Sequence, residues 1–297
     1  MATKTKTKVD PYQAVTDKIV EALEAGTVPW RKPWRSVNGI GPTSLSTGRE
    51  YQGVNVLMLS IAAFAGGYSS IYWGTYRQIA ELGGQVRKGE KSTEAVLLKR
   101  VPKEVDGEDK SFFMLRTFAI FNADQADWPE GSKLPSEPAK PEHKWTPVEL
   151  AERIHLGMPM RPEVKHGGNR AYYSPLLDYV GMPELGQFDG AEPYYATLFH
   201  ELVHATGHKS RIGRDGIEAF QSWGDENYSK EELVAEIGAA ILCTEAGIEP
   251  RIDQSAAYIE SWLKVLKGDR KCIVAAASGA GKAVDFILDR PKREGRA

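Results

Sequence analysis

The segment FHELVHATGH contains the pattern H-E-x-x-H, formed by His200, Glu201 and His204, and this pattern restricts what the chain can fold into. Two histidines four residues apart lie one turn apart on one face of a helix, so both imidazoles can bind one Zn²⁺ or another divalent ion. Zinc lowers the pKa of a bound water to near ~7, and Glu201 would lie beside that water as its base. We therefore expect a helix here and further elements that complete the site.

A catalytic zinc site normally has three protein ligands and one open position. His208 follows one turn after His204, but three successive turns of a straight helix cannot converge on one ion. Better candidates lie downstream in SKEELVAEIGAA, where Glu232 and Glu236 are four residues apart among apolar neighbours. We expect these two glutamates on one helix face and Glu231 in solvent.

The order of these motifs resembles the gluzincin metallopeptidases, in which the first acid of an E-x-x-x-D/E helix binds zinc and the second orients the first histidine. The resemblance implies that Glu232 is the third ligand and that Glu236 orients His200. The residues alone leave the swapped assignment open. Tyr228, four residues before Glu232, is a candidate oxyanion donor.

Upstream of the H-E-x-x-H helix, the segment NRAYYSPLLDYVGMP fits the edge strand that lies above a zincin active-site helix. The free edge of such a strand offers backbone groups that could take a peptide as an added strand. This segment is therefore the expected position of a bound peptide.

Prolines divide the chain into two parts. Five of its 17 prolines fall between Trp128 and Pro147, which predicts a semi-rigid linker. The predicted organisation is an unstructured arm over residues 1–9, a domain over 10–127, the linker over 128–147 and a second domain over 148–297.

The formal net charge of −2 hides an asymmetry, because residues 1–100 carry +6 and the remainder −8. The two parts are therefore expected to face different partners, and the basic part is a candidate for binding a polyanion.

Apolar periodicity predicts helices, and runs of β-branched and aromatic residues predict strands. The expected helices are 11–25, 55–65, 75–82, 147–156, 192–206, 229–246 (with Ser229 as N-cap), 254–266 and 271–288, and the expected strands or extended segments are 93–101, 111–121, 169–173 and 176–180. The fold class is therefore α+β, with a small α+β domain followed by a mostly helical, zincin-like domain of gluzincin type. The run ASGAGKA lacks the first glycine and the Ser/Thr of a phosphate loop and is expected to be structural.

Three clusters in the first domain combine aromatic and basic side chains. Aromatic rings stack on bases at ~1–3 kcal/mol each while cations follow the phosphates, a combination that favours single-stranded nucleic acid. The candidates are Trp30, Arg31, Lys32, Trp34 and Arg35 in PWRKPWR, Tyr72, Trp73, Tyr76 and Arg77 in IYWGTYRQ, and Arg87, Lys88 and Lys91 in GGQVRKGEKS. Because Trp and Tyr are also common core residues, burial of these rings is the competing interpretation.

The first half resembles the N-terminal single-stranded-DNA-binding domain of ArdC-type antirestriction proteins in the segments PYQAVTDKIVEALEAG, PWRKPW, TGREYQGVN, YWGTYRQIAELGGQVRKGEK and FAIFNADQ. TraC-type primases carry a similar domain. The second half is similar to the metallopeptidase domain that follows it in ArdC, through HELVHATGH and EELVAEIGAA. The resemblance implies a plasmid-type protein that binds single-stranded DNA, carries a zinc-dependent peptidase and protects incoming DNA from host restriction.

A host restriction enzyme or another protein would be the peptidase substrate or partner. One alternative is a non-catalytic protein that occludes DNA or binds the restriction enzyme, with a structural metal site. A second alternative is an effector peptidase whose first domain binds protein instead of DNA.

The sequence also predicts where the protein acts. No apolar run approaches the ~20 residues of a membrane span, and no apolar stretch follows the basic N-terminal residues as in a secretory signal. Cys243 and Cys272 are too few for a disulfide framework. We expect a cytoplasmic protein without a membrane partner.

Overall fold

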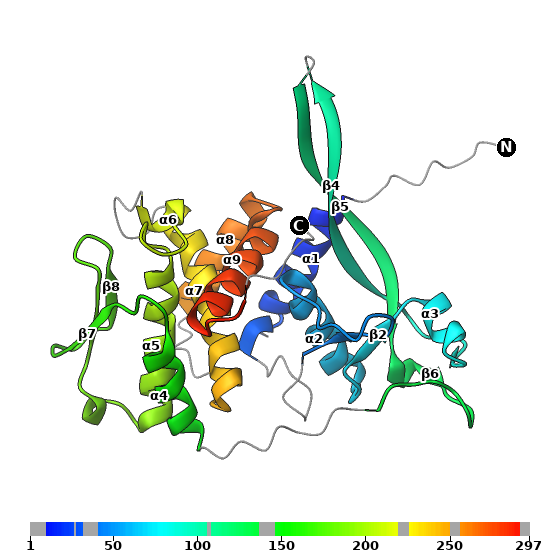
Figure 1. Cartoon of the computed structure of the whole chain (residues 1–297), viewed down its shortest axis with the longest axis horizontal. Helices are drawn as coiled ribbons and strands as arrows, with labels where there is room; N and C mark the ends of the chain where they lie inside the picture. The colour runs from blue at the N-terminus through cyan, green and yellow to red at the C-terminus, as the bar shows by residue number, and fades with distance from the viewer. Residues whose placement is uncertain are drawn as a thin grey trace.

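The computed structural model describes residues 10–26, 28–31, 41–105, 108–136, 146–218, 226–249 and 256–291. The fold is α+β, as predicted (Figure 1). The first half contains α1 (Pro11–Glu24), η1 (Pro29–Arg31), β1 (Thr43–Ser44), α2 (Val54–Gly66), β2 (Tyr72–Gly74), α3 (Tyr76–Glu81), β3 (Gln85–Val86), β4 (Thr93–Val105), β5 (Glu108–Asn122), η2 (Ala123–Gln125) and β6 (Ala126–Asp127). The second half contains α4 (Pro147–Gly157), β7 (Glu163–His166), β8 (Tyr172–Ser174), β9 (Tyr179–Met182), η3 (Leu185–Gln187), α5 (Ala191–Thr206), α6 (Asp215–Glu218), α7 (Glu226–Ala246), α8 (Ala256–Gly268) and α9 (Cys272–Ile287).

A four-stranded sheet in the order β1-β2-β5-β4 organises the first half. β4 and β5 form an antiparallel ribbon that projects from the body of the molecule (Figure 1). Both strands are longer than predicted, because most of the charged run PKEVDGEDK continues them instead of forming a wide turn. Pro102 is tolerated within β4 because β4 is the edge strand, where a residue without a backbone N–H costs no ladder hydrogen bond on the outer side.

A three-stranded sheet in the order β7-β9-β8 lies beside α5 in the second half. Among the described residues β8 pairs only with β9, so β8 is an edge strand, as expected for the upstream segment. β9 begins at Tyr179 and is the central strand, so the extended segment predicted over 176–180 is only partly correct. Leu176 and Leu177 instead lie in the connection between the two strands and are exposed.

Helices α5 and α7 pack side by side at the centre of the second half, and α9 packs on α7 (Figure 1). Helix α7 begins about one turn before Ser229, so the prediction that Ser229 is its N-cap is wrong. Gly238 of α7 faces Val203 of α5 so closely that a Cβ atom would lie 2.8 Å from Val203 Cγ2. The absence of a side chain at Gly238 therefore sets how near the two helices approach.

The largest hydrophobic cluster contains residues from both sides of the predicted linker. Trp30 of η1 meets Trp262 of α8 edge to face, with ring centroids 5.2 Å apart, and α1 lies against α8 (Figure 1). The Thr16 hydroxyl donates to the Arg270 carbonyl at 2.8 Å. Two smaller clusters lie wholly in the first half. The helix and η1 that open the chain thus share a core with the second half, and the predicted domain limits stay a prediction.

Two smaller expectations concern the C-terminal helices. The ASGAGKA run lies within α9, where Ala276, Ala280 and Ala283 are buried, so its role is structural as expected. Across the described residues, no helix combines the length and apolar character that crossing a bilayer requires.

The contact between α5 and α7 gives a stability prediction with a matched control. Gly238→Ala should lower the free energy of unfolding by ~1–3 kcal/mol, because the new methyl group forces the β-branched Val203 or the helix to shift. Gly281→Ala in α9 should instead be neutral or stabilise by up to ~1 kcal/mol, because nothing lies within 4 Å of its Cβ position and alanine favours a helix. Urea unfolding of both variants measures the difference, and equal effects would contradict the close approach.

Candidate metal centre

Helices α5 and α7 bring three metal-binding side chains together. The Nε2 atoms of His200 and His204 lie 3.1 Å apart. The Glu232 carboxylate faces both, with Oε1 3.2 Å from His204 Nε2 and Oε2 3.6 Å from His200 Nε2. Tetrahedral coordination with Zn–N bonds of 2.0–2.1 Å places ligand atoms ~3.3 Å from one another. The spacing and the N,N,O donor set therefore fit a divalent ion such as zinc.

Two further carboxylates lie behind the imidazoles, at the Nδ1 atoms that face away from this point. Glu236 Oε1 lies 3.5 Å from His200 Nδ1, and Glu231 Oε1 lies 3.6 Å from His204 Nδ1. The geometry therefore favours Glu232 over Glu236 as the third ligand, and it suits Glu236 for orienting His200. Both roles stay predictions.

Glu231 was expected in solvent, and that expectation is wrong. Its side chain is buried and forms an ion pair with Arg214, which lies between α5 and α6. The sequence placed Glu231 beside an apolar face without any indication that a cation 17 residues upstream would cover it. Arg214 and Glu231 are thus residues of the centre that the sequence analysis missed.

The buried carboxylates hold protons on the imidazoles of the metal-free protein. Burial alone would lower the pKa of His204, but the Glu231 and Glu232 carboxylates outweigh it and raise that pKa to about 10. The pKa of His200 is raised in the same way, because Glu232 outweighs the effect of burial. Burial would raise the pKa of Glu232, but the two imidazoles hold it well below its ordinary value of 4.5. The two Nε2 atoms lie 3.1 Å apart, so at most one of them carries a proton directed at the other, and a metal would have to displace that proton.

Glu201, the predicted base, is buried in α5 beside the two histidines. Burial raises the pKa of its carboxyl group above the ordinary 4.5, and the neighbouring imidazoles oppose this rise. The backbone N–H of Tyr173 in β8 also lowers the pKa of this carboxyl group, against the effect of burial. The predicted base therefore lies directly beneath the edge strand, which is where a peptide added to that strand would pass.

Arg211 fixes this edge strand to the end of α5. Its guanidinium donates from Nε to the Ala205 carbonyl at 2.7 Å and from Nη2 to the Tyr173 hydroxyl at 3.3 Å. It also forms an ion pair with Asp178, which precedes β9. This buried arginine holds the β8–β9 connection over the H-E-x-x-H helix.

Two other candidates from the sequence are His208 and Tyr228. His208 follows the end of α5, and its Nδ1 lies 2.7 Å from Ser210 Oγ, so the structure gives it a partner outside the metal centre. Tyr228 lies in α7 one turn before Glu232, but its side chain is outside the described part of the structure. Its role as an oxyanion donor stays a prediction.

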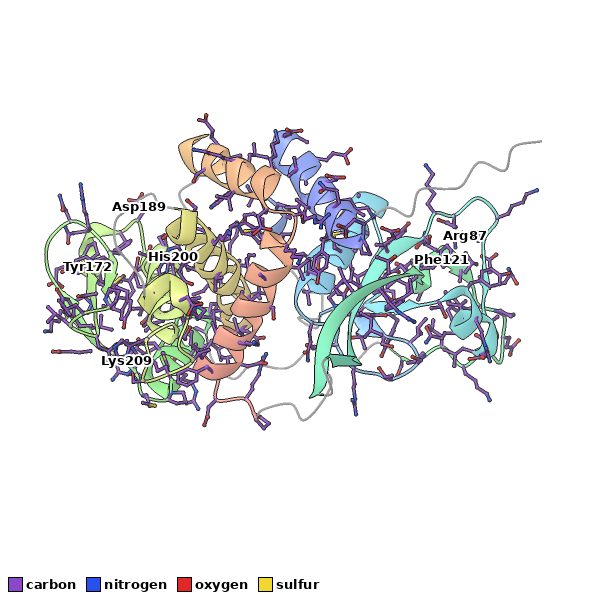
Figure 2. The ribbon with its side chains drawn as sticks, turned by 90° about the horizontal axis from the view of Figure 1, so that it is seen from above. Arg87, Phe121, Tyr172, Asp189, His200 and Lys209 are labelled. Atoms are coloured by element: carbon purple, nitrogen blue, oxygen red, sulfur yellow. The ribbon has the colours of Figure 1, made fainter. Side chains whose placement is uncertain are left out.

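A hollow of about 530 Å³ in the first half contains part of the predicted DNA-binding set. Tyr76, Arg87 and Lys88 line it, together with Gln85 and Phe121, which the sequence analysis did not select. Tyr76 is half exposed. Figure 2 shows Arg87 and Phe121 at one end of the molecule and His200 near the other. The hollow and the metal centre are therefore separate sites.

Several rings predicted to stack on bases are instead part of the core. Trp30 and Trp73 are fully buried, and Tyr72 is buried with its hydroxyl donating to the Ser136 carbonyl at 3.0 Å. A ring without an exposed face cannot stack on a base, so the stacking prediction is wrong for these three side chains in this structure. The competing interpretation, burial of the rings, holds for them.

The remaining predicted DNA-binding residues are basic side chains or lie outside the part of the chain that the structure describes. Arg77, Lys88 and Lys91 are exposed, and Arg87 forms an ion pair with Glu90 at 2.9 Å. The side chain of Arg31 and residues Lys32, Trp34 and Arg35 lie outside the described part of the chain. Contact of any of these residues with DNA stays a prediction.

Comparison with known proteins places both halves. Residues 155–279 match the zincin-like metallopeptidase family MPTase-PolyVal, so the second half is a zincin-like domain. Residues 9–123 match the N-terminal domain of the anti-restriction factor ArdC. Crystal structures of the antirestriction protein ArdC from plasmid R388, one metal-free and one Mn(II)-bound, are 42% identical to this chain with a TM-score of 0.74. The alignment covers 95% of this chain and 97% and 98% of theirs. The chain belongs to the ArdC family of antirestriction proteins.

Two sequence relatives extend the comparison. Protein y4eC of Sinorhizobium fredii, an uncharacterised protein, is 37% identical over 95% of this chain and 92% of its own length. A DNA primase TraC of Escherichia coli is 38% identical over 93% of this chain, but this chain spans only 20% of that primase. The likeness to the primase therefore concerns one part of a much longer protein.

The raised histidine pKa values predict how metal affinity depends on pH. Metal binding must displace protons from the imidazoles, so the affinity of the chelator-treated protein for Zn²⁺ should rise steadily between about pH 6 and pH 9. Calorimetric titration in buffers of different ionisation enthalpy would count the protons released. Binding without proton release at neutral pH would contradict the assigned charge state.

The same shifts set the stability of the metal-free protein. The two histidines stabilise the folded protein fully below their ordinary pKa of 6.5. This contribution to the free energy of unfolding is lost as pH rises through the raised pKa values, toward about 10 for His204. The Glu232 contribution is complete above 4.5 and is lost as pH falls below it. Thermal unfolding with a chelator present should therefore show the site contributing most between pH 4.5 and 6.5.

Proposed function

We propose that the second half is a metal-dependent peptidase and that the first half binds single-stranded DNA, in a protein that protects incoming DNA from host restriction. The observation that carries the peptidase proposal is the placement of Glu201 beside three convergent ligand atoms and beneath a free strand edge. Membership of the ArdC family supports the protective role.

The residues divide the work of peptide hydrolysis between them. A divalent ion held by His200, His204 and Glu232 would polarise the scissile carbonyl and make hydroxide available near neutral pH. The free edge of β8 would bind the peptide backbone as an added strand. A Glu201 carboxylate oxygen would accept the proton of the attacking water and then deliver it to the leaving amine.

Zinc is the ion that we propose, because two imidazoles and one carboxylate form a usual catalytic zinc set. The same donors also bind other divalent ions, and the ArdC protein of plasmid R388 was crystallised with Mn(II). Elemental analysis of protein purified without added metal would identify the ion.

Replacing the base should separate metal binding from hydrolysis. Glu201→Gln keeps the size and polarity of the side chain but removes its capacity to accept a proton, so we expect a normal metal content and at least ~100-fold slower peptide cleavage. Metal analysis and a casein cleavage assay, with Glu245→Gln as a remote control on α7, would measure both. Full activity in Glu201→Gln would refute the assigned role.

The same variant distinguishes the peptidase from the non-catalytic alternative. In cells that carry a restriction enzyme, incoming unmodified plasmid DNA should be protected by the wild-type protein and not by Glu201→Gln, if proteolysis is what protects it. Unchanged protection would favour occlusion of DNA or binding of the restriction enzyme.

A second function is favoured by the hollow in the first half. It joins exposed cations to an exposed tyrosine ring, the combination that binds single strands without reading sequence. Glu90 and Asp127 also line the hollow and limit its positive charge. We therefore propose that a few nucleotides bind here and that the strand continues over neighbouring cations.

Two substitutions test the DNA proposal. Tyr76→Ala should weaken binding of a labelled oligo-dT by about 5- to 100-fold through loss of stacking, and Lys88→Gln should reduce the slope of log affinity against log salt by about 0.7. Tyr172→Ala, which removes an exposed ring of the second half, is the matched control. Fluorescence anisotropy measures all three, and equal loss in Tyr76→Ala and Tyr172→Ala would contradict the location.

A further inference from the structure

The Arg214 guanidinium is anchored to the end of α5 and to α7 at once. Its Nη1 donates to the Thr206 hydroxyl at 2.6 Å and its Nη2 to the Val203 carbonyl at 2.8 Å. Its Nε lies 3.0 Å from one Glu231 oxygen and 3.1 Å from the other. These contacts leave the Glu231 carboxylate little freedom to move, since both of its oxygens are held by one planar group.

The carboxylate fixed in this way faces a predicted metal ligand. Glu231 Oε1 lies 3.6 Å from Nδ1 of His204, on the side of the ring opposite Nε2. Glu236 stands in the same relation to His200, at 3.5 Å from its Nδ1. At 3.6 Å the Glu231–His204 contact is an ion pair and not a hydrogen bond, and the buried His204 Nδ1 has no hydrogen-bond partner in the described part of the structure. A carboxylate that approaches such a nitrogen to hydrogen-bond distance holds the proton on Nδ1, leaves Nε2 free for the metal and fixes the plane of the ring.

We propose that Glu231, held in place by Arg214, is a positioning residue that orients His204 toward the metal. The inference rests on the proposed metal centre and not on peptide cleavage. It differs from the role assigned to Glu236, because it concerns the second histidine and adds an arginine that no motif spacing predicts.

The competing interpretation is a purely structural ion pair that ties the segment before α6 to α7. The chain offers a matched control for that role, the Glu245–Arg290 pair at 2.7 Å. Glu245 lies on the same helix 14 residues further on, ~21 Å along its axis and far from the metal ligands. If both ion pairs are purely structural, breaking either one should lower stability without a specific effect on metal binding. If Glu231 positions His204, breaking the Glu231–Arg214 pair alone should weaken metal binding.

The experiment compares Glu231→Gln with Glu245→Gln in the full chain. Zn²⁺ affinity by chelator competition should fall by about 10- to 100-fold in Glu231→Gln and stay unchanged in Glu245→Gln. The visible absorption spectrum of the Co²⁺-loaded protein should change only in Glu231→Gln, because the ring of His204 is no longer held in one orientation. Measurements well below the melting temperature of each variant separate this from loss of stability.

A second variant covers the case in which Glu231→Gln does not fold. Arg214→Lys keeps a cation beside Glu231 but loses the forked contact, so we expect a smaller loss of Zn²⁺ affinity with the same direction of change in the Co²⁺ spectrum. Wild-type affinity and an unchanged spectrum in the variants that fold would overturn the inference and leave the proposed peptidase intact. Failure of the wild-type protein to bind Zn²⁺ or Co²⁺ would overturn both.

Discussion

Buried negative charge is the constraint on which the metal centre and its surroundings depend. Four glutamates, Glu201, Glu231, Glu232 and Glu236, are buried on α5 and α7, and a carboxylate buried without a positive partner costs several kcal/mol. Arg214 supplies the fixed positive charge. The remaining positive charge comes either from protons on the two imidazoles or from a divalent ion that they bind. The stability of the fold therefore depends on the charge state of the site.

Packing must bring these charges close without allowing water between them. Helix α7 is buried on nearly every side after Lys230, and it therefore has no polar face that a sequence pattern could reveal. The pairing of the two histidines was predictable because the H-E-x-x-H spacing determines their geometry, whereas the choice of Glu232 over Glu236 came from the resemblance to gluzincins. The burial of Glu231 was not predictable, because its partner Arg214 comes from a connection whose path depends on the tertiary fold. Local spacing thus predicted the candidate histidine ligands, and only the fold shows which side chains lie behind them.

The first half shows the complementary limit of sequence reasoning. Aromatic residues beside cations suggested stacking surfaces, but the same rings are the largest pieces of apolar surface available to the core, and burying them stabilises the fold. Trp73 lies in β2 between α2 and the sheet, whereas Tyr76 begins α3 and stays exposed. The buried ring and the exposed ring are only three positions apart in the sequence, and composition does not show which of them will be buried. Every α-helix in the described part of the chain except the short α6 was predicted, because helical periodicity is local, whereas the short strands β1, β2, β3, β6 and β7 were not predicted.

The shared core has a consequence for how the two proposed functions are connected. The family match to the ArdC N-terminal domain begins at residue 9 and includes α1 and η1, yet Trp30 and the apolar face of α1 pack against the helices of the zincin-like domain. The residues that match the N-terminal family model are therefore not the same residues that share one hydrophobic core. Separating the halves at the proline-rich segment would expose Trp262 and its neighbours to water, at a cost of about 25 cal/mol per Å² of apolar surface. The segment that leads into the predicted DNA-binding loop is thus part of the support of α8 and α7, which carries Glu232.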